Sequence, residues 1–155
     1  FDLELHQMDV KTAFLNGDIE ETIYMKQPEG LAFEETSKLV CKLKKSIYGL
    51  KQASCQWYLK FHQVVLSFGF EVNTVEDCVY HKFSGSRFIF LVLYVDDILL
   101  ASNNLGMLHE TKKFLSQNFE MKDMGEATYV IGIEIFRDRS QGLLAHPKRL
   151  ILIKF

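Results

Sequence analysis

Cysteine is scarce in this sequence, and no metal-binding cysteine motif occurs. The three cysteines, Cys41, Cys55 and Cys78, lie far apart, and none belongs to a CxxC pair. An odd, scattered set predicts free thiols rather than a disulfide framework or a zinc site. The five histidines are equally dispersed, so we interpret each as an ordinary surface or core residue.

Long apolar runs and a strong net charge are also lacking. The longest apolar run, residues 88–95, is far shorter than the roughly 20 residues that a membrane helix needs. We therefore expect neither a membrane span nor a signal peptide. The formal net charge is −2, whereas complete nucleic-acid-binding domains are usually basic. One local exception is a group of lysines within fourteen residues, for which a plain solvated face is the alternative: Lys38, Lys42, Lys44, Lys45 and Lys51.

The pattern of apolar residues predicts one α+β domain. No internal repeat, low-complexity stretch or linker interrupts the 155 residues, of which 48% are hydrophobic. Apolar residues recur at helical spacing over residues 52–68, and Gly69 follows at the position of a C-terminal cap. A second amphipathic helix is expected over residues 105–118, capped by one of the polar residues 102–104.

Short runs of apolar and β-branched residues predict the strands. A β-hairpin is expected over residues 79–95, with Ser84-Gly85-Ser86 as its turn. The Asn16-Gly17 pair indicates a turn after a short helix over residues 11–15. Further strands are expected at residues 3–10, 22–26 and 98–101, and residues 129–136 and 142–145 are expected to form a final hairpin. This order of elements favours an antiparallel sheet with helices packed on one face.

A carboxylate pair, Asp96-Asp97, follows eight apolar residues and precedes four more. So apolar a strand, residues 88–95, is expected to be buried on both faces. Two adjacent anions beside it repel each other and resist desolvation unless a positive charge compensates them. A Mg²⁺ ion would supply that charge, because it prefers carboxylate and phosphate oxygens. The alternative is a plain hairpin turn, although tight turns favour Asn-Gly or Asp-Gly over Asp-Asp; the residues alone leave both open.

Five motifs in order along the chain resemble the reverse transcriptases of copia-type retrotransposons. Tyr94-Val95-Asp96-Asp97 resembles their catalytic box, and QMDVKTAFLNG at residues 7–17 resembles their first palm motif. In this chain YMKQPEG at residues 24–30 and KLKKSIYGLKQA at residues 42–53 resemble two further signatures of the family. FEMKDMG at residues 119–125, followed by YVIGIE at residues 129–134, resembles the later palm motifs and the primer grip. A lone YVDD is a weak signal, whereas five ordered motifs are a strong one.

The resemblance implies an RNA-directed DNA polymerase, a nucleotidyltransferase whose α+β palm has a ferredoxin-like core similar to that of RNA-recognition modules. It implies that Asp9, Asp96 and Asp97 are the catalytic carboxylates. Together with the backbone carbonyl of Val10, they would hold two Mg²⁺ ions, for which Mn²⁺ is a substitute. Asp9 and Asp96 would bind both ions, one activating the primer 3′-hydroxyl and the other holding the triphosphate. Phosphoryl transfer of this kind needs positioning and charge neutralisation rather than a protein nucleophile.

The resemblance also implies a nucleotide site. Phe14 lies five residues after Asp9, where the family places the aromatic ring that blocks a ribose 2′-hydroxyl. The alternative for Phe14 is an ordinary core residue, which is also how we interpret Trp57. The implied nucleotide-binding residues are Val10, Phe14, Tyr48, Gly49, Lys51, Gln52 and Tyr94.

We expect residues 1–145 to be a partial palm domain and residues 146–155 to be a divergent tail, because Pro147 interrupts the family pattern there. The implied partners are a primer–template of RNA or DNA, dNTPs, and the fingers, thumb and ribonuclease H segments of a parent polyprotein. Without those segments the isolated chain is expected to be inactive. The implied location is cytoplasmic, in a virus-like particle, with the product delivered to the nucleus. A non-catalytic RNA-binding module and an inactive relic of a retrotransposon polymerase are the alternatives.

Overall fold

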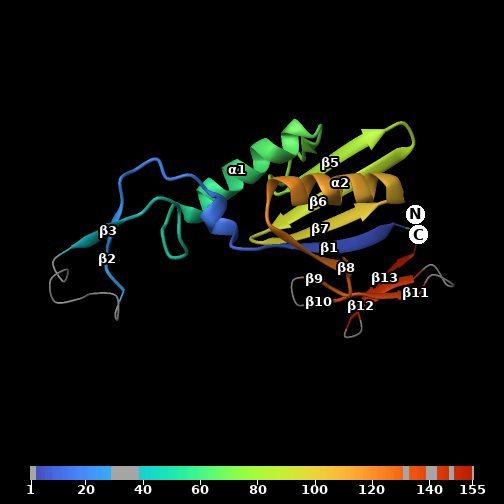
Figure 1. Cartoon of the computed structure of the whole chain (residues 1–155). Helices are drawn as coiled ribbons and strands as arrows, with labels where there is room; N and C mark the ends of the chain where they lie inside the picture. The colour runs from blue at the N-terminus through green and yellow to red at the C-terminus, as the bar shows by residue number, and fades with distance from the viewer. Residues whose placement is uncertain (1–2, 29–38, 131–132, 139–142, 147–148, 155) are drawn as a thin grey trace. The chain divides into compact units, whose positions relative to one another are not determined.

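The computed structural model describes residues 3–28, 39–130, 133–138, 143–146 and 149–154. The chain shown in Figure 1 divides into two compact units. The first unit comprises residues 1–11 and 64–155, and the second comprises residues 12–63.

The first unit is built around a six-stranded antiparallel sheet. Strand β1 (Glu4–Val10), which comes first in the chain, pairs with β7 (Asp97–Ser102) on one side and with β8 (Met121–Glu126) on the other, so it lies inside the sheet. Helix α2 (Leu105–Asn118) packs against β6 (Arg87–Tyr94), β7 and β8 (Figure 1). In spatial order the strands are β4 (Glu71–Val72), β5 (Val79–Ser84), β6 (Arg87–Tyr94), β7 (Asp97–Ser102), β1 (Glu4–Val10) and β8 (Met121–Glu126).

Alternate residues of the central strands form the core of this unit. The buried side chains of the sheet include Met8, Val10, Ile89, Leu91, Leu93, Ile98 and Leu100, and α2 contributes Met107, Leu108 and Leu115. Between them in β6, Phe88, Phe90 and Val92 are only half-buried. The prediction that this strand is buried on both faces is therefore wrong. An antiparallel strand needs only one apolar face when a helix packs on that side of the sheet, and the extra apolar residues of β6 lie on the other.

Both helices begin and end within one residue of the predicted bounds. Helix α1 covers Ala53–Ser67, and Gly69 follows it with a φ of 84°, its N–H donating to the carbonyl of Leu66. Among the three candidate caps of α2, the side chain of Asn104 accepts the hydrogen bond, from the Met107 N–H at 3.0 Å. In the described part of the chain, neither helix has the length and apolar composition needed to cross a membrane. All three cysteines are free, as predicted.

The second unit contains a short 3-10 helix, η1 (Ala13–Asn16), most of α1, and the antiparallel pair of β2 (Tyr24–Lys26) with β3 (Val40–Lys42). Trp57 and Phe61 of α1 are fully buried, with ring centroids 5.4 Å apart, so the interpretation of Trp57 as a core residue is confirmed. A Cβ atom on Gly17 would lie 3.0 Å from the backbone nitrogen of Trp57. The close approach of the helix therefore favours glycine in the turn at Asn16-Gly17, because a larger residue would displace the helix backbone by a few tenths of an ångström.

After β8 the described residues of the first unit form five further short strands. β9 (Tyr129–Val130) pairs with β10 (Ile133–Glu134), while β11 (Phe136–Asp138), β12 (Leu143–His146) and β13 (Arg149–Lys154) form a separate sheet. The expected single hairpin of residues 129–136 with 142–145 is therefore two pairings, since β9 pairs with its immediate neighbour. The α+β class and the antiparallel sheet are confirmed, whereas the polymerase palm and the ferredoxin-like core stay predictions.

A largely buried lysine joins α2 to two strands of the sheet. The Nζ atom of Lys112 lies 2.8 and 2.9 Å from the two carboxylate oxygens of Asp123 on β8 and 2.7 Å from Nδ1 of His6 on β1. Burial and the Lys112 charge lower the pKa of His6, against the raising effect of Asp123, Glu4 and Glu126. Burial alone would raise the pKa of Asp123, but hydrogen bonds from Lys112 and Gly125 outweigh it, so the pKa of Asp123 lies below its ordinary value.

These pKa shifts predict that acid destabilises the first unit in two steps. Because the folded state lowers the pKa of His6 below 6.5, the unfolded chain binds more protons as the pH falls through 6.5, and stability is lost there. The contribution of Asp123 is present above 3.8 and is lost only below it, as the pH falls through the folded pKa. The free energy of unfolding, measured with urea and far-UV circular dichroism, should fall between pH 7.5 and pH 5. In His6→Asn that fall should be smaller, and an unchanged pH dependence would contradict the assignment.

Candidate functional site

Two of the predicted catalytic carboxylates lie directly opposite each other. The antiparallel register of β1 and β7 pairs Asp9 with Asp97, so both side chains leave the sheet on the same face. The neighbouring pair, Met8 and Ile98, is fully buried and lies on the other face, toward the core. Asp9 and Asp97 are half-buried. The strand pairing therefore creates a two-carboxylate site on the face opposite the core.

The third carboxylate, Asp96, lies in the turn between β6 and β7. Tyr94 pairs with Asp97, and Val95 and Asp96 form the two-residue connection. The carbonyl of Asp96 accepts a hydrogen bond from the N–H of Val10 at 2.8 Å, which fixes the turn to the end of β1. Val95 has a φ of 57°, a conformation that costs a β-branched residue about 1–3 kcal/mol. A strained valine at a turn where glycine is favoured is typical of functional sites rather than of plain hairpins.

Two residues beside the carboxylates escaped the sequence analysis. The side-chain amide of Gln7 donates to Oδ1 of Asp97 at 2.9 Å, and Gln7 shares the face of Asp9 because side chains alternate along a strand. That period of two was visible in the sequence and was the missed signal. Lys122 of β8 pairs with Asp9 and is exposed, so it places a cation beside that carboxylate. Its position depends on the pairing of β1 with β8, which no local pattern reveals.

The carboxylate pair suits a magnesium ion that arrives with phosphate. Mg²⁺ in proteins is usually bound by one or two carboxylates together with water and substrate phosphates, and Asp9 and Asp97 are hard oxygen donors of this kind. Among the residues that the structure describes, no three His, Cys, Asp or Glu side chains are close enough to hold a metal ion by themselves. The structure thus brings Asp9 and Asp97 together as a pair and holds Asp96 beside them through its backbone.

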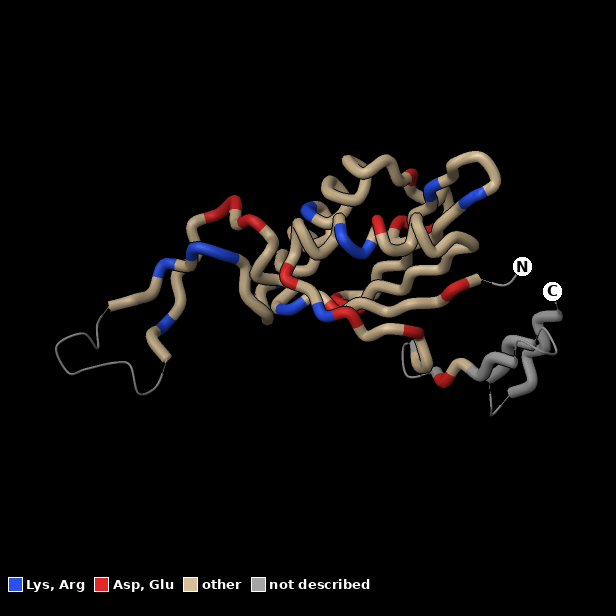
Figure 2. The backbone as a smooth tube through the Cα atoms, turned by 45° about the vertical axis from the view of Figure 1, so that its right-hand side comes forward, with Lys and Arg blue, Asp and Glu red and all other residues tan. Residues whose placement is uncertain are grey.

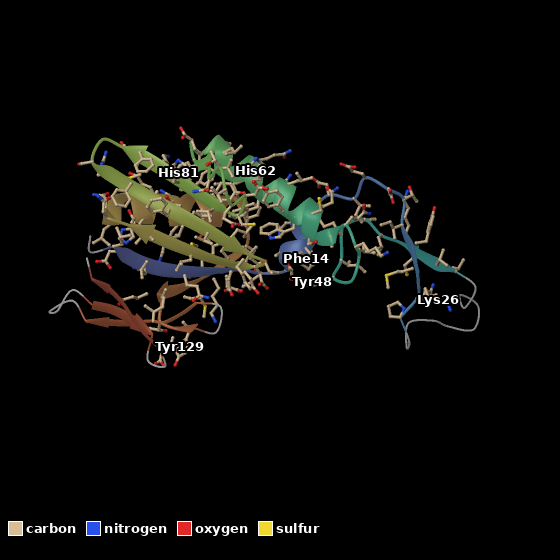
Figure 3. The ribbon with its side chains drawn as sticks, turned by 180° about the vertical axis from the view of Figure 1, so that it is seen from behind. Phe14, Lys26, Tyr48, His62, His81 and Tyr129 are labelled. Atoms are coloured by element: carbon tan, nitrogen blue, oxygen red, sulfur yellow. The ribbon has the colours of Figure 1, made fainter. Side chains whose placement is uncertain are left out.

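Two of the predicted nucleotide-binding residues of the second unit, Phe14 and Tyr48, form a ring contact. Phe14 of η1 and Tyr48 lie with ring centroids 4.3 Å apart (Figure 3). Phe14 is half-buried, and Tyr48 is exposed. Gly49 has a φ of 95°, and a Cβ there would meet nothing within 4 Å, so conformation rather than space requires glycine. Lys51 is exposed, and the carbonyl of Gln52 accepts the N–H of Gln56 at the start of α1.

Comparison with known proteins matches these features to one family. Residues 2–147 match the family model described as reverse transcriptase (RNA-dependent DNA polymerase). The retrovirus-related Pol polyprotein from transposon TNT 1-94 of Nicotiana tabacum is 49% identical over 140 residues, which are 90% of this chain and 10% of that protein. The Pol polyprotein from transposon RE1 of Arabidopsis thaliana is 40% identical over 149 residues, 96% of this chain and 10% of that protein.

A putative transposon Ty5-1 protein of Saccharomyces cerevisiae is 34% identical over 128 residues, 83% of this chain and 42% of that protein. The chain thus spans about a tenth of the length of the plant polyproteins that it matches. No solved structure matches the chain. The family match covers nearly all residues and includes both carboxylate motifs, and therefore the chain belongs to the reverse transcriptase (RNA-dependent DNA polymerase) family, as a region of a copia-type retrotransposon polyprotein.

Proposed function

We propose that this chain is the palm of an RNA-directed DNA polymerase that adds nucleotides from dNTPs to a primer 3′-hydroxyl on an RNA or DNA template. The observation that carries the proposal is the pairing of Asp9 with Asp97 beside the strained turn at Val95. Residues 1–145 are the partial palm in this proposal, and residues 146–155 are a divergent tail. The polymerase works together with the other segments of its polyprotein, in a cytoplasmic virus-like particle.

Each residue of the site has a part in the proposed reaction. Bound Mg²⁺ ions, for which Mn²⁺ is a substitute, would supply the positive charge that neutralises the triphosphate and favours the ionised primer hydroxyl. Asp9, Asp96 and Asp97, with the carbonyl of Val10, would hold those ions together with water and substrate phosphates. Gln7 limits the rotation of the Asp97 carboxylate through its hydrogen bond to Oδ1. Lys122 offers a cation beside Asp9, where phosphate oxygens or the carboxylate itself can bind it.

Asp97→Asn tests this function in a reverse transcriptase that carries this chain in place of the matching region of the tobacco polyprotein. Primer extension should fall by at least about a hundredfold, the usual effect of removing one strong electrostatic contact to a transition state. Glu110→Gln, on the exposed side of α2, is the matched control and should extend primers as the parent does. Full primer extension by Asp97→Asn would contradict the proposal. If the parent protein bound single strands without metal ions and extended no primer, the RNA-binding module would be favoured instead.

Gln7→Leu tests the positioning of Asp97. A hydrogen bond to a charged group is worth about 1.5–3 kcal/mol, so the Mg²⁺ concentration for half-maximal extension should rise by about tenfold or more. Mn²⁺ binding to the 155-residue chain, measured by electron paramagnetic resonance, should weaken in parallel, which a purely structural role would not cause. Gln117→Leu, on an exposed position of α2, is the control. An unchanged metal dependence would show that Gln7 is not a positioning residue.

Phe14→Val tests the sugar selection in the same polymerase. Loss of the ring should open space beside the 2′ carbon, so preference for dNTPs over ribonucleotides should fall by more than tenfold. Loss of one or two methylene contacts alone changes the free energy of discrimination between two substrates by about 1–3 kcal/mol. Relief of a steric clash with the 2′-hydroxyl should change it by more than the lower value of that range. Single-nucleotide incorporation with paired dNTP and ribonucleotide substrates measures the effect. Phe83→Val, at an exposed aromatic residue, is the control; a Phe14→Val enzyme with full sugar preference would leave Phe14 as an ordinary packing residue.

A further inference from the structure

Positive charge is concentrated in one stretch of this chain. Residues 36–70 contain no Asp or Glu, although the whole chain has a formal net charge of −2. The lysines of that stretch are Lys38, Lys42, Lys44, Lys45, Lys51 and Lys60. In the described residues, lysines lie on β2, on β3 and just after β3 (Figure 2). Over residues 12–63 the seven lysines exceed the six acids by one, so the positive charge is local to residues 36–60 and does not extend to the whole second unit.

The register of β2 and β3 gathers cations and an aromatic ring on one side of this two-stranded ribbon. Tyr24 pairs with Lys42, and Lys26 pairs with Val40, so all four side chains lie on the same face. Tyr24 and Val40 are 59% and 56% exposed, and both lysines are exposed as well. The central pair, Met25 with Cys41, lies on the other face and is half-buried. We call the four exposed side chains the ribbon face.

The lysines of the ribbon face and of the chain after β3 lack an acidic partner in the described structure. Lys60 and Lys11 form ion pairs, with Asp18 and Glu120 respectively. No ion pair within the described ranges involves Lys26, Lys42, Lys44, Lys45 or Lys51. The exposed acids just before β2, Glu20 and Glu21, form none either. Unpaired like charges close together repel each other, so an external polyanion would stabilise them.

We propose that the ribbon face, with Lys44 and Lys45 beside it, binds a single strand of nucleic acid. Lysines would neutralise the phosphates, and the exposed ring of Tyr24 would stack on a base, the combination used by proteins that bind single strands without sequence preference. An acidic polypeptide would neutralise the charges of the lysines, but it offers no base on which the exposed ring of Tyr24 could stack. The proposal rests on the proposed function for the identity of the strand, a template or primer, and adds a binding surface separate from the carboxylates.

Binding of a labelled single-stranded RNA to the 155-residue chain, followed by fluorescence anisotropy without divalent ions, tests the lysines. Lys26→Gln with Lys42→Gln should weaken binding and reduce the slope of log K against log salt by about 1.4, since each phosphate contact to a single strand contributes about 0.7. Arg87→Gln with Lys113→Gln removes the same charge from exposed positions of the first unit and should change the slope much less. Equal slopes for the two double variants would overturn the proposal.

Tyr24→Leu tests the stacking contact separately from the charge. Affinity for the RNA should fall by about five- to a hundredfold, because one base stacked on an aromatic ring contributes about 1–3 kcal/mol, while the salt slope stays the same. Unchanged RNA affinity in Tyr24→Leu, together with equal displacement by polyglutamate, would instead identify an acidic polypeptide as the partner. Primer extension by the Asp97→Asn polymerase and RNA binding by the variants of the ribbon face are separate measurements, so that failure of the polymerase proposal and failure of this one give different results.

Discussion

The antiparallel pairing of β1 with β7 is the interaction on which both the core and the candidate site depend. It joins residues 4–9 to residues 97–102, and closing so long a loop costs conformational entropy that local contacts do not return. The buried pair of Met8 and Ile98 offsets part of that cost. The same register sets Asp9 against Asp97 on the other face. A slip by one residue would expose the apolar pair and bury the carboxylates, so folding correctly and forming the site are one event.

The carboxylate site lowers the free energy of unfolding of the unit that contains it. Asp9 and Asp97 are like charges directly opposite on neighbouring strands, which is unfavourable. Val95 is held at a positive φ beside them. Such strain persists where the surrounding structure determines the conformation, here through the Val10 to Asp96 hydrogen bond and the buried residues of β6 and β7. A bound cation would relieve the repulsion, and for this reason the arrangement favours a metal-dependent function over a plain turn.

Exposed lysines without ion pairs cluster in one part of the described second unit, whereas the opposed carboxylates lie in the first unit. The first unit has anions at the carboxylate site and a largely buried lysine, Lys112, that is neutralised by Asp123. The second unit has exposed lysines without ion pairs among its described residues. A polymerase needs both kinds of surface, because metal ions require carboxylates and nucleic acid requires cations. A net charge near zero is therefore compatible with nucleic-acid binding when exposed lysines are gathered in one part of the chain.

Local patterns in the sequence were sufficient for the helices, their caps and the motifs. Helical spacing, Gly69 and the polar residues before Leu105 act within a few residues, so both helices could be predicted and the cap of α2 could be limited to residues 102–104, among which the structure selects Asn104. The motifs around Asp9 and Asp96-Asp97 likewise identified the family from short contiguous stretches. Only the tertiary structure decided which strands are neighbours. It paired Asp9 with Asp97 rather than Asp96, placed Lys122 beside Asp9, and left one face of β6 half-exposed. Strand order and register arise from burial shared between segments about ninety residues apart, and a period of two along one strand carries no information about its partner.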